Sequence, residues 1–214
     1  MNDFNFLKTE IEESYMSNEM LLHSSTGDGR LDSAESESVV LAHFQNLFQN
    51  TEVKITPAPE QRYWYDLLIE YHGKKYPVNI KITSGSGADN ISSKLGLFYT
   101  LTGIWPENVK GLNQWRFYNE AITSNFNPNT DGDYYFITYF KEEGIFLFTS
   151  LKRINSLTPN GNNLPFQCKW NENCIMAKRD NDEQCEYLIN TYYDSWVKKV
   201  SGFEPLMNWK NNHI

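Results

Sequence analysis

The chain has 214 residues, of which 40% are hydrophobic and 15% aromatic, a composition that supports a well-buried core and argues against wholesale disorder. The formal charge of −8 argues against a simple nucleic-acid binder, because contacts to phosphate need Lys and Arg. No apolar stretch approaches the roughly 20 residues that a membrane span needs. The N-terminal sequence has no signal-peptide pattern, so we expect a cytoplasmic protein without a membrane partner.

The negative charge is concentrated at the N-terminal side. Residues 1–60 hold 11 acidic and 3 basic side chains, whereas the remainder holds 16 of each. The remainder is therefore able to carry a local basic face. The three cysteines Cys168, Cys174 and Cys185 are odd in number and contain no C-x-x-C pair, so we expect buried, reduced thiols, with a zinc site as the weaker alternative.

The first third of the chain predicts two helices. The first runs from Phe4 to about Leu22, and a polar loop follows it. Ser33 has the character of an N-cap for the second, which ends near Phe48. Its apolar residues fall on one stripe at helical spacing: Val40, Leu41, Phe44, Leu47 and Phe48.

The middle of the chain changes to strand periodicity. Residues 64–71 and 76–82 predict two strands around a turn at 72–75. A glycine-rich loop at 84–87 follows, and Asp89 or Asn90 is expected to cap a helix that ends near Leu101.

The last half predicts further alternation of helices and strands. The expected elements are a helix at 113–123, a hairpin at 133–140 and 145–150, a loop at 155–163, a strand at 164–170 and a helix at 182–200. This order indicates an α/β (α+β) fold with a mixed central β-sheet flanked by helices, in a single domain over 1–214.

The candidate chemistry lies on the hairpin. Asp66 begins one strand, and Asn79 and Lys81 share a face of the other because they are two residues apart. An Asp oxygen is a hard ligand that suits Mg²⁺, and a nearby Lys positions or deprotonates an attacking water. Glu37 lies on the apolar stripe of the second helix and is the preferred helix-borne acid, with Glu35 as its rival. The alternative is that both acids only stabilise the N-terminus of that helix.

This arrangement resembles the PD-(D/E)XK nucleases, which combine an Asp before a strand, a second acid, one spacer and a Lys. Asp66 and Lys81 match that pattern, whereas Asn79 replaces the second acid with a neutral amide. Residues 35–170 are similar to type II restriction endonucleases of this superfamily, in particular around Lys81, in 88–94 and in 163–170. The resemblance implies a restriction-endonuclease-like core at 33–103, an N-terminal helix and loop at 1–32, and the remaining sheet, DNA-reading loops and last helix at 104–214.

The resemblance further implies a Mg²⁺-dependent, sequence-specific endonuclease that cuts double-stranded DNA to 5′-phosphate ends as a homodimer. Asp66, Asn79 and Glu37 would be the metal ligands, and Lys81 would orient the attacking water. Hydroxyls, amides and ammonium groups supply contacts to phosphates and bases. The candidate DNA-binding residues are Ser84, Ser86, Asn90, Ser92, Ser93, Lys94, Asn163, Gln167 and Lys169, with Asn160 and Asn162 beside the last three.

Three alternatives remain open at this point. The first is another nuclease of the same fold that does not recognise one short sequence. The second is a non-enzymatic DNA-binding or interaction domain in which Asn79 marks a degenerate site. The third is an unrelated α/β domain whose acidic N-terminal part docks a protein partner, which the overall charge favours. No phosphate-binding loop or dinucleotide fingerprint is present, so we expect no nucleotide cofactor.

Overall fold

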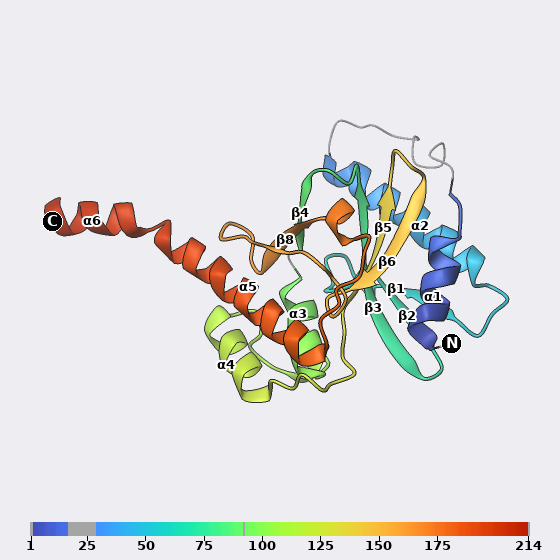
Figure 1. Cartoon of the computed structure of the whole chain (residues 1–214), viewed down its shortest axis with the longest axis horizontal. Coiled ribbons are helices and arrows are strands. Elements are labelled where there is room, and N and C mark those ends of the chain that lie inside the picture. Colours follow the sequence, from blue (N-terminus) through green and yellow to red (C-terminus); the bar gives the residue numbers. More distant parts are fainter. Residues whose placement is uncertain (1, 17–28, 92, 214) are drawn as a thin grey trace. The chain divides into compact units, whose positions relative to one another are not determined.

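The computed structural model describes residues 2–16, 29–91 and 93–213, and of residues 29–35, 212 and 213 only the backbone. The chain forms two compact units (Figure 1). Unit 1 comprises Met1–Gly87 with Gly132–Leu151, and unit 2 comprises Ala88–Asp131 with Lys152–Ile214. The segments 1–32, 33–103 and 104–214 do not coincide with these units, and the single nuclease domain stays a prediction.

Unit 1 is built on a mixed five-stranded sheet, as the sequence predicts. Its order is β1-β2-β3-β5-β6, in which β3 and β5 are parallel and every other pair is antiparallel. The strands are β1 (Lys54–Pro57), β2 (Leu67–Tyr71), β3 (Lys74–Thr83), β5 (Tyr135–Phe140) and β6 (Ile145–Ser150). The parallel pair requires a long crossover, and the chain between β3 and β5 includes residues 88–131 of unit 2.

The β2–β3 hairpin has a tighter turn than predicted. Only His72 and Gly73 separate the strands, and their φ angles of 48° and 75° are both positive, as a two-residue hairpin turn requires. The register pairs Leu67 with Val78 and Tyr71 with Lys74. Residues 64–66, which we predicted as strand, precede β2.

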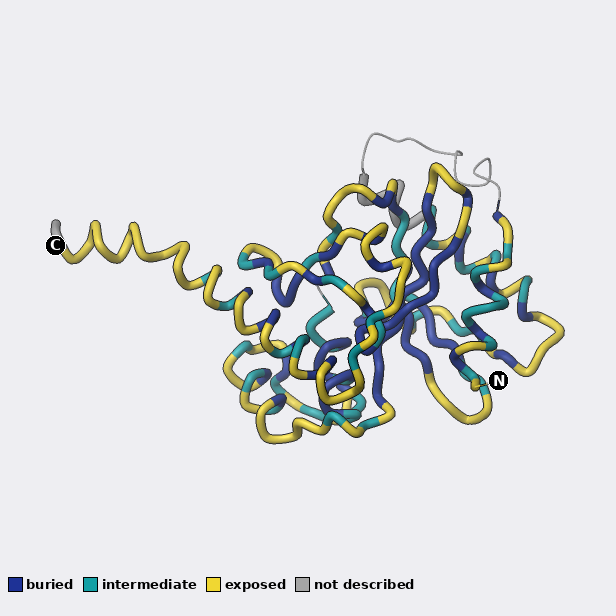
Figure 2. The backbone as a smooth tube through the Cα atoms, viewed as in Figure 1, coloured by how far each residue is buried: buried dark blue, intermediate teal, exposed yellow. Residues whose placement is uncertain are grey.

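Two helices pack on the sheet of unit 1. They are α1 (Asp3–Glu12) and α2 (Gly29–Leu47). Their apolar residues and one face of the sheet form a single core: Phe4, Leu7, Ile11, Val40, Phe44, Phe48, Leu67, Ile69, Tyr76, Val78, Ile80, Tyr135, Ile137, Tyr139, Phe146 and Phe148. Figure 2 shows β5 and β6 as buried along most of their length.

Both helix boundaries differ from the prediction. The first helix ends at Glu12, where the Ser14 hydroxyl donates a hydrogen bond to the Ile11 carbonyl (2.7 Å) and competes with further helical bonding. Residues 13–16 of the predicted helix are not helical, and its last part, 17–22, lies outside the described residues. The second helix begins at Gly29, so Ser33 lies inside it rather than at its cap, because a cap preference of about 1 kcal/mol does not by itself fix a helix start.

Unit 2 contains a second sheet that the sequence analysis missed. Its order is β4-β8-β7, all antiparallel: β4 (Ala88–Ile91), β8 (Phe166–Lys169) and β7 (Thr158–Pro159). The predicted capping by Asp89 or Asn90 is wrong, because both lie in β4. The helix that follows is α3 (Lys94–Thr102), and the Ser93 hydroxyl caps it by accepting a hydrogen bond from the Gly96 amide (3.1 Å).

The other helices of unit 2 are α4 (Trp115–Asn125), α5 (Asn181–Ser201) and α6 (Glu204–His213), with short 3-10 turns at Pro106–Asn108 and Trp170–Asn173. The last long predicted helix is confirmed as α5, and Asp180 and Glu183 form a capping box at its start. The sequence analysis missed α6, whose residues are exposed from Glu204 to Asn211 (Figure 2). None of the described helices is long and apolar enough to cross a membrane.

The cysteines are all free thiols. Cys168 and Cys185 are buried, as predicted, whereas Cys174 is exposed. The prediction is therefore wrong for Cys174, which follows the 3-10 turn at Trp170–Asn173 on the surface of the unit.

Candidate active site

Backbone pairing fixes the position of Asp66 in unit 1. Its amide donates a hydrogen bond to the Val78 carbonyl (2.9 Å), and its carbonyl accepts one from the Ala58 amide (2.9 Å). Asp66 is therefore held between β3 and the residue that follows β1, one residue before β2 begins. Because its backbone is hydrogen-bonded to a segment on either side, the position of the Asp66 side chain is fixed.

The Asp66 carboxylate contacts β3 directly. Its Oδ2 accepts hydrogen bonds from Asn79 Nδ2 (2.7 Å) and from the Ile80 amide (2.7 Å). Because Leu67 pairs with Val78, continuing the antiparallel register brings Asp66 beside Asn79, on the strand face that the hairpin pattern predicts to meet Asp66. The Ile80 amide is a partner that the sequence analysis missed, and the hairpin register was the signal that points to it.

The sheet separates this site from the core of unit 1. Val78 and Ile80 are core residues, and side chains alternate along a strand, so Asn79 and Lys81 lie on the opposite face of β3. Both side chains are half-buried. The predicted pairing of an amide and a lysine on one face of β3 is therefore confirmed.

The pKa of Asp66 reflects the charges of two other predicted residues, Glu37 and Lys81. Burial of the carboxyl raises its pKa from 3.8 to about 6; the hydrogen bond from the Ile80 amide opposes this, the charge of Glu37 adds to it and the charge of Lys81 opposes it. Glu37 and Lys81 are therefore near enough to Asp66 for their charges to act on it. The side chain of the rival acid Glu35 lies outside the described residues.

The oxygen atoms present suit a hard cation. Oδ2 of Asp66 accepts two hydrogen bonds, and Oδ1 accepts none from the described part of the chain. Glu37, whose charge acts on Asp66, would add a second carboxylate, and Asn79 would add a neutral amide oxygen. Among the described residues no three His, Cys, Asp or Glu side chains form a group that could hold a metal ion. Mg²⁺ is commonly bound by one or two carboxylates and several waters, so two acids and an amide fit it.

The candidate DNA-binding residues of unit 1 lie after β3. Ser84 and Ser86 are both exposed. Between them Gly85 has a φ of 84°, and its amide donates a hydrogen bond to the Thr83 hydroxyl (3.0 Å). This turn requires glycine and leaves the two serines on the surface.

In unit 2 the structure joins two predicted patches that are far apart in sequence. Asn90 on β4 pairs directly with Gln167 on β8, and Asn160 donates hydrogen bonds to the side chains of both. Asn163 is exposed, and its amide donates to Asn160 Oδ1 (3.1 Å). Lys169 forms an exposed ion pair with Glu172 at 3.7 Å.

Two other candidates are engaged within unit 2. Ser93 caps α3, and Lys94 Nζ donates a hydrogen bond to the Asn113 carbonyl (2.9 Å) and lies 4.5 Å from the centre of the Trp115 ring. Burial lowers the pKa of Lys94. Ser92 lies outside the described residues. Contact of any of these residues with DNA stays a prediction.

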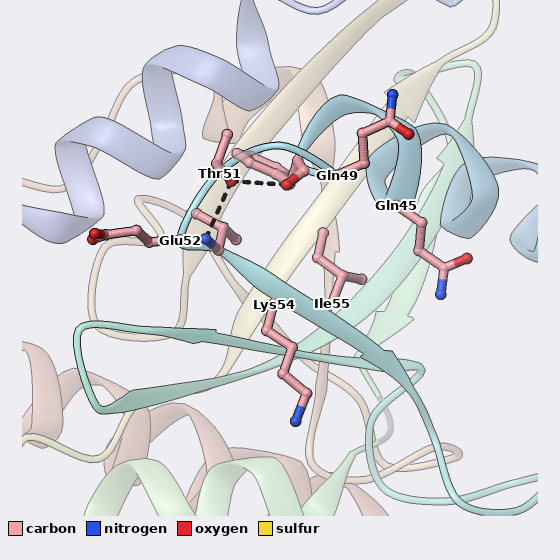
Figure 3. Close-up of a pocket in the computed structure, with 8 residues that line it drawn as sticks. Gln45, Gln49, Thr51, Glu52, Lys54 and Ile55 are labelled. Atoms are coloured by element: carbon pink, nitrogen blue, oxygen red, sulfur yellow. Dashed lines mark hydrogen bonds between the residues drawn. The ribbon is translucent and has the colours of Figure 1, made fainter.

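A surface pocket of unit 1 contains none of the predicted site residues. It lies between the end of α2 and β1 (Figure 3), where the Thr51 hydroxyl accepts a hydrogen bond from the Val53 amide (3.1 Å) and donates one to the Phe48 carbonyl (2.9 Å). Its lining consists of Gln45, Phe48, Gln49, Thr51, Glu52, Val53, Lys54 and Ile55. The pocket offers one acid and one lysine among amides and apolar groups, and it has no counterpart in the sequence analysis.

No family model, curated protein or solved structure matches this chain.

Proposed function

We propose that the chain is a Mg²⁺-dependent endonuclease that cuts double-stranded DNA at a specific sequence, as a type II restriction enzyme does. The observation that carries the proposal is the Asp66 site. A half-buried carboxylate accepts hydrogen bonds from Asn79 and from the Ile80 amide, and it lies within electrostatic reach of Glu37 and Lys81. Carboxylate and amide oxygens are able to hold the metal ion of metal-assisted phosphodiester hydrolysis, and a lysine beside them is able to position the attacking water.

Each residue has a distinct role in the proposed reaction. Asp66, Glu37 and Asn79 provide the oxygens that would hold Mg²⁺, which supplies electrostatic stabilisation of the scissile phosphate when bound. Lys81 orients the attacking water and stabilises the added negative charge. The water oxygen forms a bond to phosphorus, the bond to the 3′-oxygen breaks, and that oxygen takes a proton. The products are a 5′-phosphate and a 3′-hydroxyl.

The proposal includes two copies of the chain and a cytoplasmic location. Cutting both strands of a palindromic sequence needs one active site for each strand, so the partner would be a second copy related by a two-fold axis. The charge of −8 is compatible with DNA binding because the excess of acidic residues lies within 1–60. The remaining residues are free to present a local basic surface.

Cleavage by matched lysine variants tests the site. Lys81→Ala should lose Mg²⁺-dependent cutting of phage DNA by about 100-fold or more, the usual effect of removing a group that stabilises transition-state charge. Lys75→Ala, which removes an exposed lysine from the same strand and the same face, should cut like wild type. Equal loss in both variants would assign the effect to general charge and would count against the catalytic role of Lys81.

Asn79→Asp tests the ligand role of Asn79. The new carboxylate adds a negative oxygen beside Asp66, so Mg²⁺ should bind more tightly if Asn79 is a ligand. Titration calorimetry with Mg²⁺ measures the change. Unchanged affinity would contradict the assignment of Asn79 as a ligand.

A second function is favoured by one specific observation. The side-chain amide of Asn79 donates to Asp66 Oδ2. The Asp66 pKa of about 6 means that the carboxyl is protonated and neutral more readily than an ordinary Asp, so the site needs no cation to balance its charge. The chain would then be a DNA-binding or interaction domain with a degenerate nuclease site. This alternative predicts DNA binding that persists unchanged in Lys81→Ala, with no cutting by wild type.

A further inference from the structure

The small sheet of unit 2 carries a polar face on one side. Residues directly opposite one another in an antiparallel pair share a face, so the side chains of Asn90 and Gln167 lie together. Two residues further along the strands, the pair Ala88 and Lys169 lies on the same face. The opposite face carries the buried pair Ile91 and Phe166. This face is therefore anchored by packing on its other side.

Asn160 lies beside both amides and is itself held by hydrogen bonds. It is 9% exposed, its backbone amide donates to the Ser195 hydroxyl (2.9 Å), and its Oδ1 accepts from the amides of Asn162 and Asn163 (3.0 and 3.1 Å). Ser195 is itself buried and donates to the Thr191 carbonyl. Asn160 therefore has one side-chain orientation, with its Nδ2 directed at the two strand residues.

Asn160 Nδ2 donates a hydrogen bond to the oxygen of each neighbouring amide. It donates to Asn90 Oδ1 at 2.7 Å and to Gln167 Oε1 at 3.1 Å. Within the described ranges, no acceptor is bound to Asn90 Nδ2 or Gln167 Nε2. The pair therefore presents hydrogen-bond donors and has its acceptors turned toward Asn160.

Lysines flank this face. Lys169 lies on it, two residues beyond Gln167, and is exposed beside Glu172. Lys198 Nζ donates to the Pro159 carbonyl (3.2 Å) and Lys199 Nζ to the Gly161 carbonyl (3.4 Å), so both lie against the segment that holds Asn160. Their charges favour a polyanion next to the two amides.

We infer that Asn90 and Gln167 form a base-reading pair that selects guanine, with Asn160 as its positioning residue. An amide whose oxygen and nitrogen are both available reads adenine, which presents one donor and one acceptor in the major groove. Guanine presents two acceptors there, O6 and N7, and a pair of donors matches it. Phosphate oxygens are acceptors as well, so the test must separate the two sources. The inference deepens the proposed function by naming a feature of its recognition sequence.

The test is selection of bound duplexes from a random-sequence pool by the full-length chain. Ca²⁺ replaces Mg²⁺ as the hard cation, so that the readout is binding and does not need cleavage. The enriched sequence should contain a fixed guanine. Replacing that guanine by 7-deazaguanine, which removes the N7 acceptor, should weaken binding by about tenfold.

Isosteric variants separate base reading from contact with phosphate. Gln167→Glu keeps the acceptor for Asn160 and replaces the outward donor by an oxygen, so the preference for guanine should be lost and cytosine, which offers an N4 donor, should gain. Asn90→Asp should act likewise. Asn129→Asp adds the same charge at an exposed site of unit 2 and should leave the enriched sequence unchanged.

The binding results can be distinguished from the results of the cleavage assays that test the proposed nuclease. A fixed guanine that depends on N7 and on Gln167 supports the inference even if the chain does not cut DNA. Equal weakening on all sequences in Gln167→Glu, with no effect of 7-deazaguanine, would assign the pair to phosphate and overturn it. Cutting without any fixed guanine, or no enrichment, would overturn it as well.

Discussion

Replacing Asp66 by Asn should change how the stability of the protein depends on pH. Asn keeps an oxygen that can accept the hydrogen bonds from Asn79 and Ile80, and it has nearly the same shape as Asp. The variant removes only the titration of the carboxyl and its negative charge. It therefore isolates the cost of keeping that charge buried.

The magnitude follows from the pKa of Asp66. Burial and the charge of Glu37 raise it from 3.8 to about 6, a difference that corresponds to about 3 kcal/mol. Because the folded state holds the proton more tightly than the unfolded state, the stabilisation is fully present below pH 3.8 and is lost as the pH rises through about 6. Above that pH the charged carboxylate destabilises wild type relative to Asp66→Asn.

Urea unfolding between pH 4 and 7 in the absence of divalent cations measures this difference. The unfolding free energy of Asp66→Asn minus that of wild type should rise by up to about 3 kcal/mol across this range. Glu142→Gln, at an exposed position in the β5–β6 turn, is the control and should show no such rise. Parallel curves for wild type and Asp66→Asn would refute a buried, charged Asp66.

Three further changes have defined outcomes. In the same urea assay at pH 7, Mg²⁺ at ten times its dissociation constant should raise the unfolding free energy of wild type by about 1.4 kcal/mol. The unfolding free energy of Asp66→Asn should not change. An equal effect on both proteins would show that the cation binds elsewhere. Asn173→Ala should lower the unfolding free energy measured in urea by about 3 kcal/mol or more. The Asn173 side chain is 1% exposed, accepts hydrogen bonds from the amides of Asn155 and Ser156, and donates to two carbonyls. A loss below about 1 kcal/mol would contradict this. Ending the chain at Gly202 should change the unfolding free energy by less than about 0.5 kcal/mol, because α6 is exposed from Glu204 to Asn211, and a larger loss would show that α6 packs on something.

Local patterns were sufficient to predict the hairpin and the shared strand face of Asn79 and Lys81. Alternation of Val78 and Ile80 with Asn79 and Lys81 sets which residues face the core, and a short turn sets the register. The exact register was not predicted, because the predicted turn at 72–75 is two residues longer than the turn at His72 and Gly73 that places Asp66 beside Asn79. Electrostatic contact with Glu37 was predicted from its position on the apolar stripe of the second helix.

Long-range pairing was the part that the sequence did not reveal. Asp89 and Asn90 have strong preferences for helix caps, yet they lie in β4 because residues 166–169 pair with them about 78 residues later. For the same reason Asn90 and Gln167 were treated as members of two separate patches. The structure shows that they are neighbours in the sheet and that Asn160 donates hydrogen bonds to both.

Incubation of wild-type protein with a mixture of plasmid and phage DNA, in Mg²⁺ and in EDTA, tests the central claim most directly. The account predicts discrete fragments that form only with Mg²⁺ and carry 5′-phosphates, so that a ligase rejoins them without a kinase step. A smear would leave a nuclease without sequence specificity. The absence of cutting with any divalent cation would contradict the claim and favour the DNA-binding domain with a degenerate site.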